Sequence, residues 1–144
     1  MNTQRLIVNL ERIVRERTPE YESLDHPRFD EKLLKAHYLL ARLHSRQSNT
    51  EWAHSHFRKA ESEFYRMCEE RIKRAKESDY FSDEEGLERL RARNRAIEKE
   101  LTHYKGKLFR IGSQIGYDAS HLLFAQTSPN PPKSLEEKIG IYRR

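Results

Sequence analysis

Seven histidines are the residues of this chain whose chemistry best suits a metal ion. Zinc sites use His or Cys ligands at short fixed spacings, such as i and i+4 on one helix face. His54 and His56 are two residues apart and point to different sides of a helix, and no other pair has the required spacing. We therefore expect packing or surface histidines and no metal site. The seven are His26, His37, His44, His54, His56, His103 and His121.

The remaining reactive groups do not form a catalytic set. Cys68, the single cysteine, falls on the apolar side of an expected helix, where a thiol is buried and inert. The carboxylates at 83–85 precede a helix, where the helix dipole favours negative charge without catalysis. Gly112 and Gly116 lack the strand and the lysine of a phosphate-binding loop. The sequence predicts a protein that is not an enzyme and uses no cofactor.

Two groups of basic residues could contact nucleic-acid phosphates. One ends the expected third helix and the other begins the fourth, so a hairpin would bring them together. Phosphate binding needs several cations on one surface, ideally beside aromatic rings. Cations at a helix C-terminus and interleaved charges are, however, also typical of solvated helix faces. The candidate patch consists of Arg71, Lys73, Arg74, Lys76, Arg89, Arg91, Arg93 and Arg95.

Polar aromatic rings gather in the segment expected to form the second helix. Such rings combine apolar area with a hydrogen-bonding tip, which suits protein–protein contact. If the first two helices present a concave face, these rings would line a groove for a partner peptide or helix. The candidate groove residues are His37, Tyr38 and His44.

Apolar residues at helical spacing predict the elements that position these groups. We expect helices over 3–17 and 30–46, joined by a Pro-containing loop. A capping box of Ser48 and Glu51 predicts the start of a third helix, which ends at 78–79. No strand pattern competes anywhere in the chain.

The fourth helix has the most regular pattern. A capping box of Ser82 and Glu85 begins it, Gly112 and Gly116 mark its end, and Asp118 could cap a short fifth helix. Its apolar residues alternate at spacings of three and four, as in a coiled-coil seam. The seam comprises Leu87, Leu90, Asn94, Ile97, Leu101, Tyr104, Leu108, Ile111 and Ile115.

This seam must be buried against another helix. The third helix of the same chain is one partner, reached by a short turn in antiparallel fashion. The fourth helix of a second chain is the other, because a lone Asn such as Asn94 at an a position often specifies register and oligomeric state. Local contacts avoid the entropy cost of association, so we favour the intrachain hairpin, with a homodimer as the alternative.

The stretch 34–62 has the small and apolar residues of two closely packed antiparallel helices. It resembles a tetratricopeptide repeat, a helix–turn–helix unit of about 34 residues. Tyr65 stands where the family often has Pro, there is no second copy, and a stable array usually needs about three repeats. A generic helical hairpin with the same spacings is the other interpretation. The residues that carry the resemblance are Leu40, Ala41, Ala53, Phe57 and Ala60.

The composition suits thin helical layers. Of 144 residues, 35% are hydrophobic and 35% charged, and the mean hydropathy is −1.01. We expect an all-α fold of helical hairpins, with one domain over 1–126 and a Pro-containing linker and basic tail over 127–144. A single cysteine fits a reducing compartment. No apolar run approaches the roughly 18 residues of a membrane span, so we expect a soluble cytoplasmic protein.

These patterns favour two functions. The first is a non-enzymatic adaptor or assembly subunit that binds a peptide or helix of another protein. The second is a basic helical subunit of a nucleoprotein complex, favoured by the net charge of +5. The two should differ in salt dependence, because phosphate binding weakens steeply with salt and apolar docking does not.

Overall fold

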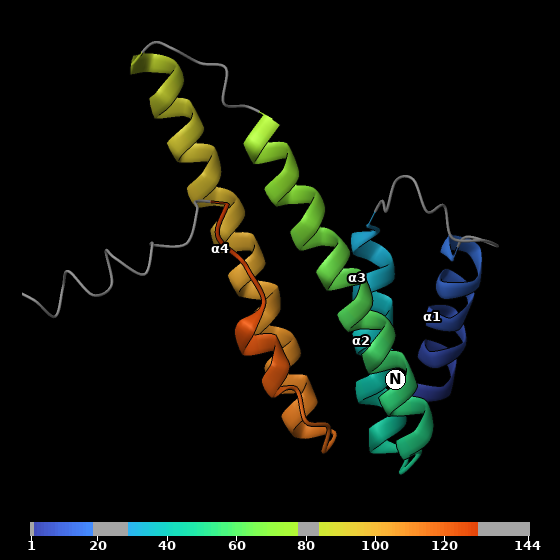
Figure 1. The fold of residues 1–144 in the computed structure, drawn as a ribbon. Helices are drawn as coiled ribbons and strands as arrows, with labels where there is room; N and C mark the ends of the chain where they lie inside the picture. The colour runs from blue at the N-terminus through green and yellow to red at the C-terminus, as the bar shows by residue number, and fades with distance from the viewer. Residues whose placement is uncertain (1, 19–28, 78–83, 130–144) are drawn as a thin grey trace, which may run out of the picture.

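The computed structural model describes residues 2–18, 29–77 and 84–129, with the backbone alone at 76 and 77. The elements are α1 (Thr3–Arg17), α2 (Glu31–Arg46), α3 (Thr50–Glu77), α4 (Glu84–Gln114) and the short 3₁₀ helix η1 (Ser120–Phe124). Successive long helices run antiparallel, and η1 folds back along α4 (Figure 1). The all-α fold is confirmed, and the described residues include no strand.

Side-chain caps explain where α1 and α2 begin. The Asn2 side chain accepts a hydrogen bond from the Gln4 backbone N–H, which satisfies one free donor of α1. Asp30 performs the same function for α2, because its Oδ1 accepts from the N–H groups of Lys32 and Leu33. The expected start of the second helix at Asp30 is therefore its N-cap.

Ser48 ends α2, and the predicted capping box with Glu51 is wrong. The Ser48 backbone has a φ of +60°, the left-handed conformation found just after a helix C-terminus. The Asn49 N–H donates to the His44 carbonyl and the Ser48 N–H to the Ser45 carbonyl, which is the Schellman pattern. The Ala53 N–H donates to the Asn49 carbonyl, so Asn49 directly precedes the first residue of α3. The helix therefore begins one residue later than the capping box requires. The second predicted box starts at Ser82, outside the described residues.

The α2–α3 pair forms the centre of the molecule. Small side chains at Ala41, Ala53 and Ala60 are fully buried, which lets the two helices approach closely. Phe57 and Phe64 fill the space between these contacts and α4. The five residues that carry the tetratricopeptide resemblance are all fully buried, as any close-packed hairpin requires, so the structure does not distinguish the two interpretations.

The seam of α4 packs on α3 of the same chain. Seam residues from Ile97 to Ile115 belong to the main core together with Phe64, Met67 and Ile72 of α3. Nearer the start of α4, Leu87 is 39% exposed, and Leu90 is only partly buried. The favoured intrachain hairpin is therefore present (Figure 1), and the buried residues of its seam begin at Ile97.

The C-terminal end of α4 packs closely against Phe57 of α3 and against Ala119, which precedes η1. Gly116 has a φ of +72°, and Tyr117 N–H donates to the Gly112 carbonyl, so Gly116 ends the helix as predicted. Gly112 lies inside α4, where an added Cβ would meet Ala119 at 2.9 Å and Phe57 at 3.1 Å. Its role is close packing rather than helix termination.

The first helix belongs to a second, smaller core. Ile7 and Leu10 of α1 pack on Ala36, Leu40 and Leu43 of α2. Among the described elements, α1 contacts only α2. One flank of α1 is therefore not covered by any of the other described elements.

Candidate partner-binding surfaces

The three residues predicted to line a groove are buried. His37 and His44 face α3 and are 3% and 7% exposed. Tyr38, also 7% exposed, packs toward α4, where Lys107 Nζ lies 5.8 Å from its ring centre. In the described structure these rings are core residues, so a partner could reach them only if the helices separated.

His37 and His44 instead belong to a cluster of four rings between α2 and α3. The Nδ1 atoms of His37 and His56 are 3.0 Å apart. The His44 ring stacks on His56, with ring centres 5.5 Å apart and planes within 2°. Trp52 covers the outer side, 6.0 Å from His44, and is 56% exposed. We call His37, His44, Trp52 and His56 the ring cluster.

Burial keeps two members of the ring cluster neutral. It lowers the pKa of His37 to about 3, with a further contribution from the nearby His56. It lowers the pKa of His56 to about 4, assisted by His44. Because both rings are neutral, one Nδ1 carries a hydrogen and donates it to the other.

The geometry of the ring cluster does not suit a metal ion. The planes of His44 and His56 are parallel, so the lone pairs of their ring nitrogens lie in separate planes and do not converge. Within the described ranges, no three His, Cys, Asp or Glu side chains are grouped to hold a metal. The cluster is therefore described better as a hydrogen-bonded and stacked part of the α2–α3 interface.

An open groove does exist on α1 and α2, but on the outer side of α2. Its volume is about 350 Å³, and its apolar lining comes from Leu10 and Ile13 of α1 and from Ala36 and Leu39 of α2. Leu39 and Ile13 are only partly buried, so their side chains are accessible in the groove. Four charged residues complete the lining: Glu16, Arg17, Lys32 and Lys35.

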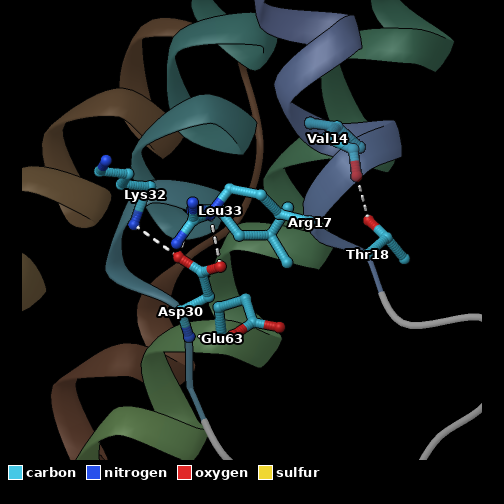
Figure 2. Close-up of polar contacts among 7 residues, drawn as sticks. All are labelled: Val14, Arg17, Thr18, Asp30, Lys32, Leu33 and Glu63. Carbon is cyan, nitrogen blue, oxygen red and sulfur yellow. Dashed lines mark hydrogen bonds and ion pairs between the residues drawn. The ribbon is translucent and has the colours of Figure 1, made fainter.

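One end of this groove is fixed by a polar junction around Asp30 (Figure 2). Arg17 Nε at the end of α1 lies 2.6 Å from Asp30 Oδ2, and the Asp30 backbone N–H donates to Glu63 of α3. Burial raises the pKa of Asp30, but hydrogen bonds from Arg17, Leu33 and Lys32 outweigh it and keep the carboxyl ionised. The junction joins three helices.

The predicted basic patch lies on the α3–α4 hairpin and is partly neutralised. Of its described members only Arg71 is partly buried, and the exposed ones are Lys73, Arg74, Arg89, Arg91, Arg93 and Arg95. Three of these members contact carboxylates: Arg71 with Glu100 at 3.4 Å, Arg74 with Glu70 at 2.6 Å, and Arg89 with Glu85 at 2.9 Å. The side chain of Lys76 lies outside the described residues. The patch is thus a surface of mixed charge.

Cys68 has the character of a structural thiol. It is 5% exposed in the main core. Burial raises its pKa to about 12, so the nucleophilic thiolate is negligible at neutral pH.

The groove residues were not singled out by sequence reasoning, and the reason is physical. Leu10, Ile13, Ala36 and Leu39 have the helical spacing of ordinary core residues. In the structure Ile13 and Leu39 are only partly buried. The basic residues of α2 were the available signal, because they occur without interleaved acids.

None of the described helices has the length and apolar character needed to cross a bilayer. Comparison of the chain with protein families, with curated proteins and with solved structures finds no match.

Proposed function

We propose that this chain is a non-enzymatic adaptor or assembly subunit that binds a peptide or helix of a partner protein between α1 and α2. The observation that carries the proposal is the groove of about 350 Å³ with an aliphatic floor. Grooves of this kind between helices accept the apolar face of an amphipathic helix.

The arrangement of α1 supports this proposal. Because α1 contacts only α2 among the described elements, its flank beside the groove has no intramolecular cover. On that flank Leu6 is 39% exposed and precedes Ile13 by two helical turns. A partner helix along this flank would bury Leu6 and Ile13 together with Leu39.

The alternative, a nucleic-acid-binding subunit, has less support. Three arginines of the α3–α4 patch already pair with carboxylates, which reduces the positive charge available to phosphates. An aromatic ring for base stacking is also poorly available beside the described part of that patch. The centre of the Phe29 ring lies 5.0 Å from the Arg71 guanidinium, and this ring is only partly exposed.

Selection of binding peptides tests the proposed function. The full chain is presented to a displayed library of random 16-residue peptides, and the enriched peptides are titrated into ¹⁵N-labelled protein. We expect the largest amide shifts at Leu10, Ile13, Ala36 and Leu39. Shifts confined to the α3–α4 hairpin, or no enrichment, would contradict the proposal.

A further inference from the structure

We infer that the segment bound between α1 and α2 is an acidic amphipathic helix. This inference rests on the proposed function and adds the chemistry of the partner. It comes from the charges that surround the groove.

The exposed face of α2 is basic along its whole length. Glu31 is the only acidic residue of this helix, and it lies 3.6 Å from Lys35, so that one pair is compensated. The other cations of α2 make no ion pair within the described residues. They are Lys32, Arg42 and Arg46.

Helical spacing places these cations beside the groove. Lys32 and Lys35 line it directly. Arg42 follows Lys35 by seven residues, and Arg46 follows Arg42 by four, so the three share one face. Leu39 lies on the same face between Lys35 and Arg42. The basic stripe therefore runs beside the aliphatic floor for about 20 Å, from Lys32 to Arg46.

The opposite rim does not cancel this charge. On α1 the groove is lined by Glu16 and Arg17, one charge of each sign. Both are compensated, since Glu16 lies 4.0 Å from Arg12 and Arg17 pairs with Asp30 at the polar junction. The net field at the groove is positive and comes mainly from α2, which favours an acidic occupant.

The aliphatic floor of the groove favours a protein partner over a nucleic acid. Single-stranded nucleic acids bind through basic grooves with aromatic rings on which bases stack. The floor here consists of Leu10, Ile13, Ala36 and Leu39, and none of the described lining residues is aromatic. Apolar side chains spaced at i, i+3 or i+4 and i+7 on a partner helix fit such a floor, with acidic residues along one edge.

The peptide selection described above also tests this inference. In 100 mM salt, we expect enriched 16-residue peptides to combine leucine-like residues at helical spacing with a net charge of −2 or lower. Enrichment of neutral or basic peptides that still bind the groove would overturn the acidic partner and leave the adaptor function standing. Absence of enrichment would overturn both.

A pair of charge variants makes the test specific. Lys32→Glu with Arg46→Glu reverses two exposed cations of the stripe, and Lys99→Glu with Arg110→Glu reverses two exposed cations of α4, which supplies none of the described lining residues of the groove. Each pair changes the net charge equally. We expect the first pair to weaken the selected acidic peptide at least tenfold and the control to change it less than threefold, with helical content retained by circular dichroism.

Equal weakening by both pairs would show non-specific attraction and overturn the inference. So would binding of a fluorescent single-stranded RNA oligonucleotide that displaces the peptide and is itself lost in the Lys32→Glu, Arg46→Glu variant.

Discussion

His37 and His56 join α2 to α3 through their Nδ1 atoms, which are 3.0 Å apart. Both rings are buried, and the ammonium group of Lys59 acts on each from the surface side. A proton added to either ring would place a positive charge in this interface, and a proton on the accepting Nδ1 would also remove the hydrogen bond. The pair therefore makes the interface sensitive to acid.

We expect the free energy of unfolding to fall as the pH drops below about 6.5. The unfolded chain binds protons at its histidines near pH 6.5, whereas His37 in the folded chain does so only near pH 3. Stability from this group is complete above pH 6.5 and is lost progressively toward pH 3. At pH 5 the loss from His37 is about 1–2 kcal/mol.

Urea unfolding at pH 7 and pH 5 measures this loss. A variant with His37→Asn and His56→Asn should lose less stability over this interval, because neither side chain titrates. The control is His103→Gln, at an exposed position. An unchanged pH dependence in the double variant would contradict the prediction.

Two glycines of α4 should respond oppositely to the same substitution. Gly112→Ala should destabilise the protein, because the new methyl group would meet Ala119 and Phe57 at about 3 Å. Gly106→Ala should stabilise it by about 0.5–1 kcal/mol, because no atom lies within 4 Å and alanine is the better helix former. Thermal unfolding of both variants measures the effects, and stabilisation by Gly112→Ala would show that the contact relaxes without cost.

Asp30 should contribute to stability mainly as the N-cap of α2. Asp30→Ala removes the acceptor for two backbone N–H groups and should cost about 1–2 kcal/mol in urea unfolding. Asp30→Asn keeps a capping oxygen and loses the charge that faces Arg17, an exposed pair worth under about 1 kcal/mol. Equal losses in the two variants would assign the stability to the ion pair instead.

The seam of α4 should tolerate charge at its beginning and not at its middle. Leu101 is fully buried, so Leu101→Glu should cost several kcal/mol and unfold the chain. Leu87→Glu, at a position 39% exposed, should change stability by at most about 0.5 kcal/mol.

Sedimentation over a wide concentration range completes this test. We expect a monomer, because the intrachain hairpin already buries the seam from Ile97 onward. A dimer that dissociates in the folded Leu87→Glu variant would place a homodimer contact at the start of α4.

The sequence predicted the helices well because their signals are local. The bounds of α1 match the expected 3–17, and the alternation of α4 predicted a buried seam, which packs on α3 as the favoured of the two alternatives had it. Ser48 was misassigned because serine at this turn suits either a helix start or a left-handed helix end. The hydrogen bonds from 48 and 49 back to α2 decide between them, and they depend on the whole turn.

The candidate sites were harder to predict, since they depend on contacts between helices. Sequence spacing correctly separated His54 from His56, but could not show that His56 would lie between His37 and His44. The groove likewise depends on how α1 packs against α2. From the sequence alone, Ile13 and Leu39 look like ordinary core residues.

The burial of Cys68 makes its thiol a probe of transient opening of the fold. Because this is the only cysteine and its thiol is protonated and covered, a thiol-specific reagent at neutral pH can modify the chain only during transient openings of the α3–α4 pair. The rate of labelling therefore reports how large a fraction of the time this pair is open. If a bound partner slows the labelling, binding between α1 and α2 also stabilises the packing of α3 on α4.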